Sequence, residues 1–215
     1  MDDDRLFQAD RLTYRYGRLL VFQDVCFSLQ AGEVVQLLGP NGSGKSTLLR
    51  CLAAWTRPAS GSVLLRGEEL GGPRRELRSQ VVLVPDQPPF FDDLTAGEHV
   101  EFVLKANRLE HRQEVAQALL DGFGLASHLQ KYPSAYSRGM RQKLALCLML
   151  MLQPAVMLAD EPFGSLDPEA RELLVQELHK AADSGAAVLV SSPGPIPELE
   201  PSRTFWLQEQ ALHVS

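Results

Sequence analysis

A glycine-rich loop between an apolar run and a helical pattern constrains the fold of this chain more than any other feature. The apolar run 34–38 leads into the loop, the helical pattern 47–54 follows it, and the loop reads Gly39-Pro40-Asn41-Gly42-Ser43-Gly44-Lys45-Ser46-Thr47. Glycines let successive backbone N–H groups curl around a phosphate, and the positive end of the following helix points at the same anion. The pattern therefore predicts a P-loop between a buried strand and a helix.

Lys45 and Ser46 complete the chemistry of this loop. A lysine ammonium at this position reaches the β- and γ-phosphates of a nucleotide, and a serine hydroxyl supplies an oxygen ligand to Mg²⁺. We therefore expect residues 39–47 to bind ATP together with Mg²⁺, and Lys45 to take part in catalysis. The loop indicates the class of ligand, but not what the energy of that ligand is used for.

Two carboxylates, Asp160 and Glu161, directly follow a second apolar strand pattern, 156–159. An Asp-Glu pair after an apolar run is usually part of a solvated loop. Here a P-loop lies about 115 residues upstream, which favours catalytic roles. We expect Asp160 to hold the Mg²⁺ shell and Glu161 to polarise the attacking water.

Strand and helix patterns alternate at both ends of the chain, and helices alone occupy its middle. Strands are expected at 6–14, 25–29, 34–38, 61–65, 81–84, 156–159, 187–190 and 204–207. Helices are expected at 47–54, 95–106, 110–120, 137–152 and 168–185. A capping box at Thr95 and Glu98 opens the second of these helices, and Asp167 caps the last one. This order predicts an α/β core with a helical insertion.

Composition and charge exclude several classes of protein. The formal net charge of −6 offers no basic surface to nucleic acid, so we expect no nucleic-acid partner. Three cysteines without CxxC spacing argue against a disulfide framework or a zinc site and favour a reducing compartment. The acidic start, Met1 to Arg5, lacks the apolar segment of a signal peptide, and the longest apolar stretch, 144–152, is about half a membrane span. We therefore expect a soluble chain.

Two further motifs flank the acidic pair. Tyr136-Ser137-Arg138-Gly139-Met140-Arg141-Gln142-Lys143 precedes it, and Gly164-Ser165-Leu166-Asp167-Pro168 follows it. In this order the motifs resemble the signature sequence and the D-loop of the nucleotide-binding subunit of an ABC transporter. Tyr16, 23 residues before Gly39, stands where that family places an aromatic ring that stacks on adenine.

The resemblance covers nearly the whole chain and implies a fold. It implies a P-loop NTPase (RecA-like) α/β core with an N-terminal antiparallel β subdomain and an inserted helical subdomain. On this basis residues 1–215 form one nucleotide-binding domain. Residues 1–88 and 154–215 would form the core with the β subdomain, and about 89–153 the helical subdomain.

The resemblance also implies partners and a mechanism. Ser137 and Gly139 of the signature would complete the ATP site of a second nucleotide-binding domain, in a homo- or heterodimer, and Asp167 would lie at the dimer seam. ATP would hold two domains together, and hydrolysis would let them part. A separate transmembrane permease subunit would receive this movement through the helical insertion. The chain would then be cytoplasmic, and peripheral on the inner face of the cell membrane.

Three departures from the family pattern bear on this expectation. Asp86 stands where transporters of the family usually carry a glutamine near Mg²⁺, with Gln87 next to it, so either residue is a candidate for that role. Pro193 stands in the place of the switch histidine, which predicts slow hydrolysis, because losing one preorganised polar group costs about 2.7–4 kcal/mol in barrier. Arg138 and Met140 give Ser-Arg-Gly-Met in place of the commoner Ser-Gly-Gly-Gln, and the Gly-Met variant resembles subunits of exporters whose membrane domain is a separate polypeptide, which favours export.

Two other functions compete with a transport ATPase. One is an ABC ATPase of DNA repair or translation, although those usually carry a long coiled coil or two cassettes in one chain. The other is a hydrolysis-impaired regulatory half of a heterodimer, which Pro193 favours and Glu161 opposes. The transported substrate leaves no trace in this sequence.

Overall fold

A six-stranded sheet forms the centre of the molecule. The computed structural model describes residues 5–214. The strand order is β10-β9-β3-β8-β7-β6. The strands are β3 (Val34–Leu38), β6 (Val81–Val84), β7 (Val156–Asp160), β8 (Ala187–Ser192), β9 (Arg203–Gln208) and β10 (Ala211–Val214). All neighbours pair in parallel except β10 with β9, so the carboxyl ends of β3, β7 and β8 lie at one edge.

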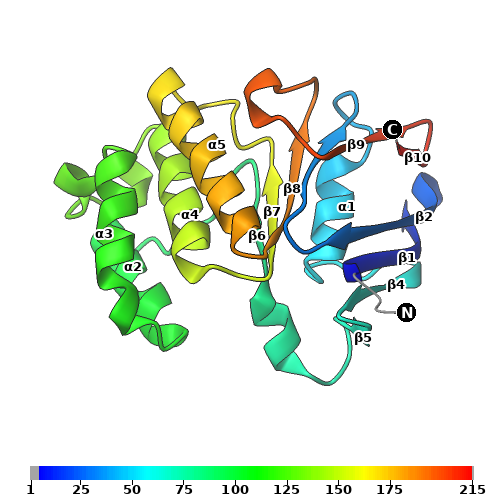
Figure 1. Cartoon of the computed structure of the whole chain (residues 1–215), viewed down its shortest axis with the longest axis horizontal. Helices are drawn as coiled ribbons and strands as arrows, with labels where there is room; N and C mark the ends of the chain where they lie inside the picture. Colours follow the sequence, from blue (N-terminus) through cyan, green and yellow to red (C-terminus); the bar gives the residue numbers. More distant parts are fainter. Residues whose placement is uncertain (1–4, 215) are drawn as a thin grey trace.

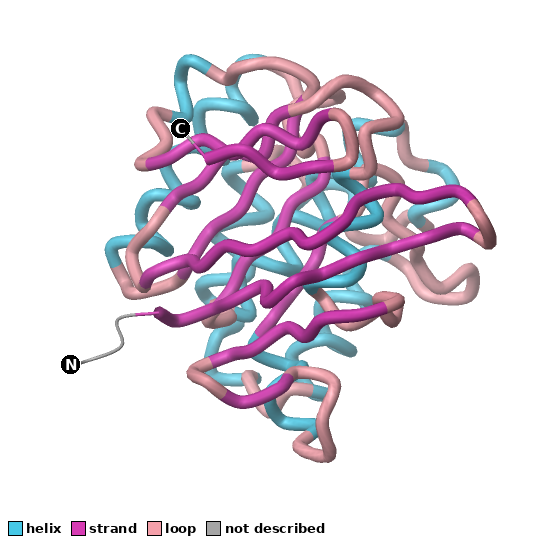
Figure 2. Tube along the Cα trace, turned by 90° about the vertical axis from the view of Figure 1, so that its right-hand side faces the viewer, coloured by secondary structure: helices cyan, strands magenta, loops and turns pink. Residues whose placement is uncertain are grey.

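A second, antiparallel sheet is formed by strands from the first 70 residues. Its order is β2-β1-β4-β5, with β1 (Arg5–Tyr16), β2 (Leu19–Gln30), β4 (Ser60–Leu65) and β5 (Glu68–Glu69). Figure 2 faces this sheet and shows its strands lying across the molecule in front of the helices. The Gln23 N–H donates to the Gln210 carbonyl at 2.9 Å, which ties this sheet to the turn between β9 and β10.

Helices cover both faces of the central sheet. In Figure 1, α1 (Lys45–Leu52) lies between the two sheets, and α4 (Arg138–Leu152) and α5 (Pro168–Asp183) cover the opposite face. Side chains alternate along β7: Leu158 packs in the core around α1, whereas Met157 and Ala159 pack in the core around α4 and α5. Strands β3, β7 and β8 are buried on both faces, which explains their nearly continuous apolar runs.

A helical segment is inserted between β6 and β7. It contains α2 (Ala96–Ala106) and α3 (Gln113–Gly122), which pack beside α4 at the far end of the molecule from the antiparallel sheet (Figure 1). The predicted capping box is present at the start of α2: the Glu98 N–H donates to Thr95 Oγ1, and the Thr95 N–H donates to the Glu98 carboxylate. None of the described helices is long and apolar enough to cross a membrane.

The predicted fold class is confirmed, and several element boundaries differ. Helix α1 begins two residues earlier than predicted, because Gly44 in a left-handed conformation serves as its N-cap. β1 and β2 extend to Tyr16 and Leu19, since these residues pair across the turn at Gly17. The helix expected at 110–120 is a 3₁₀ turn, Glu110–Arg112, followed by α3.

Several short elements were not predicted from the sequence. They are β5, β10 and the 3₁₀ segments Arg75–Gln80, Ala126–His128, Pro133–Ala135 and Pro197–Leu199. β10, for instance, is stabilised by its pairing with β9, which no local pattern reveals. The expectation about the acidic start falls partly on residues 1–4, outside the described residues.

The fold predicts how the three thiols react. Cys26 is exposed, whereas Cys51 and Cys147 are buried, and burial raises the pKa of the Cys51 thiol to about 12 and also raises that of Cys147. Because the thiolate is the reactive species, a thiol reagent at mildly alkaline pH should label Cys26 alone in the folded chain and all three cysteines in denaturant. Peptide mapping by mass spectrometry checks this. Rapid native labelling of Cys51 or Cys147 would contradict the packing.

Candidate functional site

The glycine-rich loop runs from the carboxyl end of β3 to the first turn of α1. Gly44 has a φ of 105° and is the N-cap of α1, a conformation that favours glycine. At Gly39 a Cβ would collide with the Leu207 carbonyl oxygen, so only glycine allows the close approach of β9. The first turn of α1 contains no acidic residue, so nothing there opposes an anion at the N-terminus of the helix.

Lys45 lies buried inside this loop, with only 4% of its surface exposed. Its Nζ donates to the Gly39 carbonyl at 2.8 Å and to the Pro40 carbonyl at 3.3 Å, and it pairs with Glu161 Oε1 at 3.3 Å. A buried ammonium needs such partners, since an unpaired buried charge is costly. The glycine-rich loop and the carboxylate that follows β7 thus both contact the Lys45 ammonium group.

The Ser43 hydroxyl indicates whether the loop suits an anion. Its Oγ is buried and has no hydrogen-bond partner in the described part of the chain, although buried polar groups are normally bonded. An unpaired donor, a buried ammonium and the N-terminus of α1 therefore lie within seven consecutive residues, 39–45. This donor set fits a phosphate group.

The acidic pair is held by β8. Strand β7 ends at Asp160, which is opposite Ser191 in the parallel register. The Ser191 Oγ donates to Asp160 Oδ1 at 2.6 Å and accepts from the Glu161 N–H at 3.1 Å. Glu161 itself has a φ of 49°, an unfavourable left-handed conformation for a residue other than glycine. Ser191 was not identified as a site residue from the sequence. Its role depends on the pairing of β7 with β8, which puts it opposite Asp160 and which no local pattern reveals.

A cleft of about 390 Å³ opens over the loop. It brings together predicted residues from four parts of the chain: Tyr16, Asn41, Gly42, Gly44, Lys45, Ser46, Thr47, Asp86 and Glu161 line it, along with Leu19 and Val21. Asp86 therefore lines the cleft, whereas the exposed Gln87 is not among the lining residues.

Tyr16 stands at the mouth of this cleft. Its hydroxyl lies 3.5 Å from Thr47 Oγ1, and its ring packs edge-on against Tyr14 at 5.0 Å between ring centroids. The side chain is 54% exposed, so it leaves aromatic surface open towards solvent. This position suits a ring that stacks on a planar ligand.

The predicted signature residues lie at the start of α4, outside the cleft lining. Ser137 is the N-cap of α4, and its Oγ accepts from the Met140 N–H at 3.2 Å. A Cβ at Gly139 would lie 2.5 Å from the Ser165 carbonyl oxygen, so α4 touches the 164–167 segment through a residue without a side chain. Only glycine fits there.

Two ion pairs connect the start of α4 to the rest of the chain. Arg138 pairs with Asp86 at 2.6 Å, and Lys143 pairs with Asp167. The hydrogen bond from Lys143, followed by that from the Ala170 N–H, lowers the pKa of Asp167 from its usual value. A carboxyl whose pKa is lowered in the folded chain stabilises the fold at pH values above its pKa in the unfolded chain. The contribution of Asp167 is therefore present at neutral pH, and it is lost as the pH falls through the lowered pKa of the folded state.

The loop after β8 contains Pro193 at the position where the family resemblance leads us to expect a histidine. Gln36, buried in β3, donates through Nε2 to Ser192 Oγ at 2.8 Å, and Ser192 Oγ donates to the Gly194 carbonyl at 2.7 Å. His179 binds the Leu199 carbonyl from α5, so it is engaged elsewhere. The loop is thus held on the face of the sheet that α5 covers.

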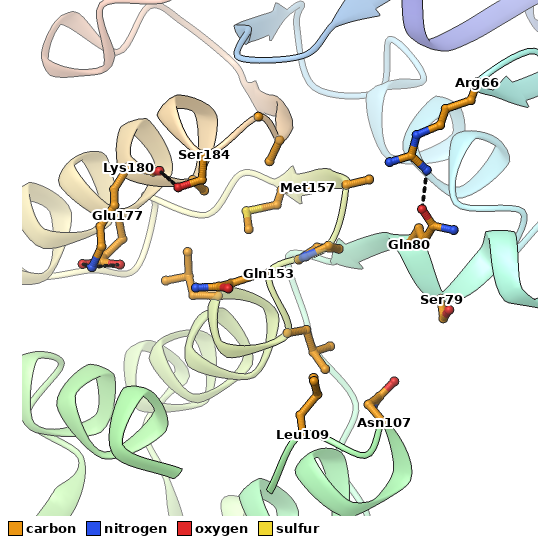
Figure 3. A pocket seen from close by; sticks show the side chains of 17 residues that line it. Arg66, Ser79, Gln80, Asn107, Leu109, Gln153, Met157, Glu177, Lys180 and Ser184 are labelled. Carbon is orange, nitrogen blue, oxygen red and sulfur yellow. Dashed lines mark hydrogen bonds and ion pairs between the residues drawn. The ribbon is translucent and has the colours of Figure 1, made fainter. Parts of the chain in front are cut away.

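A larger hollow, of about 480 Å³, lies at the opposite edge of the sheet (Figure 3). It is lined by the carboxyl ends of α4 and α5 and by residues such as Ala155 and Ala186, which precede β7 and β8. Lys180 there pairs with Glu177, and Arg66 bonds Gln80. With these charged groups engaged and no phosphate loop beside it, this hollow is not the candidate site.

Comparison with known proteins agrees with this geometry. The family model described as ABC transporter matches residues 22–164. The ABC-type transporter ATP-binding protein EcsA of Bacillus subtilis (strain 168) is 34% identical over 189 residues, which are 87% of this chain and 76% of EcsA.

Solved structures give the same result. A structure described as the ATP binding subunit of an ABC transporter has a TM-score of 0.90 and 29% identity, covering 98% of this chain and 89% of that one. The dimeric structure of MJ0796, a bacterial ABC transporter cassette, has a TM-score of 0.84 and 25% identity, covering 96% of each chain. The chain therefore belongs to the ABC transporter family, as an ATP-binding subunit.

Proposed function

We propose that this chain binds Mg-ATP in the cleft over residues 39–47 and couples its binding and hydrolysis to substrate movement by a separate permease. The observation that carries the proposal is Lys45, which lies between two carbonyls of the loop and the Glu161 carboxylate at 3.3 Å. The Lys45 ammonium group would attract the phosphates of ATP, and it lies beside Glu161, the residue that would activate the attacking water.

The predicted binding and catalytic residues at the cleft have distinct roles in this proposal. Residues 39–44 direct backbone N–H groups at the phosphates, and Lys45 neutralises their charge. Ser46, Asp160 and Asp86 hold Mg²⁺, which would supply further charge neutralisation. Glu161 orients and deprotonates water, while Tyr16 stacks on the base.

The position of Asp86 supports its choice over Gln87 in this role. Asp86 lines the cleft together with Ser46, and Gln87 is exposed and not among the lining residues. An aspartate brings a negative charge where the family usually has a neutral amide. Arg138, at 2.6 Å, offsets that charge.

A second nucleotide-binding domain completes the site in this proposal. Ser137 and Gly139 would face the phosphate held by the partner, and Asp167 would lie at the seam between the two. The close contact of Gly139 with Ser165 supports this, because it keeps the start of α4 and the 164–167 segment together as one surface.

The helical insertion is the proposed contact with the permease. Phe91 and Phe102 are 56% and 49% exposed, and the Phe91 ring stacks with His99 at 5.9 Å between ring centroids. Exposed neighbouring aromatic rings favour contact with a partner. Residues 1–88 and 154–215 would then act as the core and about 89–153 as the moving part, in the cytoplasm at the inner face of the membrane. The Gly139-Met140 pair favours export.

Pro193 supports a second candidate, a regulatory half of a heterodimer that binds ATP and hydrolyses it slowly. The proline has no side-chain donor, so β8 supplies no imidazole to the γ-phosphate or to Glu161. Binding would be retained in this case, because Lys45 and the loop do not depend on position 193.

Replacement of Lys45 tests the binding site. Lys45→Ala should weaken Mg-ATP binding by about 10–100-fold, since charged hydrogen bonds of this kind contribute about 1.5–3 kcal/mol. Isothermal titration calorimetry measures the change. Lys180→Ala, at the opposite edge of the sheet, is the matched control and should bind as the unsubstituted chain does; equal affinity of both variants would contradict the site.

Turnover tests the role of position 193. The purified chain should hydrolyse ATP slowly, and Pro193→His should raise steady-state turnover, because a preorganised donor at such a site is worth about 10²–10³-fold in kcat. Phosphate release measures it. Fast turnover by the unsubstituted chain that disappears in Glu161→Gln would rule out the slow-site hypothesis.

Dimerisation tests the role of the signature. In a Glu161→Gln background, Gly139→Ala should reduce ATP-dependent dimerisation while leaving ATP binding by the monomer intact, because its Cβ would push against the Ser165 carbonyl. Light scattering after size-exclusion chromatography reports the dimer. Gly71→Ala, where the nearest atom is a flexible glutamate oxygen at 3.7 Å, is the control. A dimer of normal stability in Gly139→Ala would argue against this seam.

A further inference from the structure

Ser191 connects the end of β8 to both members of the acidic pair. Its side chain is fully buried, its Oγ lies 2.6 Å from Asp160 Oδ1, and the same oxygen lies 3.1 Å from the Glu161 nitrogen. We propose that Ser191 is a positioning residue for the catalytic carboxylates, fixing the Asp160 side chain for Mg²⁺ and the Glu161 backbone for the attacking water. The inference rests on the proposed function, because it assigns Ser191 a role in that same site.

The hydroxyl group has only one way to make both bonds. It carries one proton, which goes to the Asp160 carboxylate because an ionised carboxylate can only accept. The oxygen then accepts the Glu161 N–H with a lone pair. One side chain therefore fixes the orientation of a carboxylate through Oδ1 and the direction of the next peptide group. The Ser191 bond engages Oδ1 of Asp160, so Oδ2 would be the oxygen available to a cation shell.

Glu161 needs this support because of its backbone. With a φ of 49° it occupies a left-handed conformation, which persists only where surrounding contacts hold it. Its N–H is shared between two acceptors, and both belong to Ser191: the hydroxyl at 3.1 Å and the carbonyl at 3.2 Å. Loss of the hydroxyl leaves one longer bond, so the peptide is free to turn and to carry the Glu161 side chain away from Lys45.

Ser192 provides a matched comparison on the same strand. Successive side chains of a strand point to opposite faces. Ser192 is likewise buried, at 5% exposure, but it bonds Gln36 and the Gly194 carbonyl on the face that α5 covers. Replacing either serine removes a buried hydroxyl from β8. Only Ser191 contacts the carboxylates, so only its replacement should change how the site handles Mg²⁺.

The experiment measures ATP affinity with Mg²⁺ and with a chelator, by calorimetry, together with Tm. Ser191→Ala should lose about tenfold or more of the gain in affinity that Mg²⁺ gives, since partners that orient metal ligands contribute about 10–100-fold to metal affinity. Its ATP affinity in the chelator should stay unchanged. Ser192→Ala should keep the full gain from Mg²⁺.

Two further variants distinguish a positioning role of the Ser191 hydroxyl from an effect of the substitution on packing. Ser191→Thr and Ser191→Val have nearly the same shape, so any strain from the added atoms is common to both, and only the threonine keeps the hydroxyl. Ser191→Thr should retain the gain from Mg²⁺ and Ser191→Val should lose it. This pair decides the question even if Ser191→Ala folds poorly.

Two outcomes would overturn the inference, and they differ from failure of the proposed function. Equal gains from Mg²⁺ in Ser191→Thr and Ser191→Val would show that the hydroxyl does not position the site. Parallel losses in Ser191→Ala and Ser192→Ala would mean that general damage to β8 is responsible. Absence of any gain from Mg²⁺ in the unsubstituted chain would instead overturn the proposed function, and the Ser191 inference with it.

Discussion

The parallel pairing of β3, β7 and β8 is the constraint on which the rest of the site depends. Because all three strands end at the same edge, the loop after β3 meets the carboxylates at the end of β7 and the hydroxyl near the end of β8. Lys45 and Glu161 are 116 positions apart in sequence and 3.3 Å apart in space for this reason. Burial of the sheet on both faces, by α1 on one side and by α4 and α5 on the other, holds these ends rigidly in place.

Much of the site was predictable wherever its chemistry is local. The glycine-rich loop before α1, the cap at Ser137, the cap at Asp167 and the capping box at Thr95 each follow from a few neighbouring residues, and the structure contains all of them. Boundaries were predicted less well where pairing decides them. β2 begins at Leu19 rather than Val25, because its first residues pair with the end of β1.

Contacts between distant residues could not be predicted from local patterns. Ser191 looks like an ordinary residue in an apolar strand until the register puts it opposite Asp160. The same holds for Asp86 and Arg138, which are two separate departures from the family pattern in the sequence. In space they form one ion pair, so the charge that the first introduces beside the cleft is matched by the second.

Gly139 has a mechanical consequence. The Ser165 carbonyl oxygen lies 2.5 Å from where a Gly139 Cβ would be, and Lys143 pairs with Asp167 one turn further along α4, so the start of α4 is packed and paired against the segment that begins α5. The two helix starts therefore form a rigid joint. We therefore expect a displacement of α5 to reach Ser137 through these two contacts.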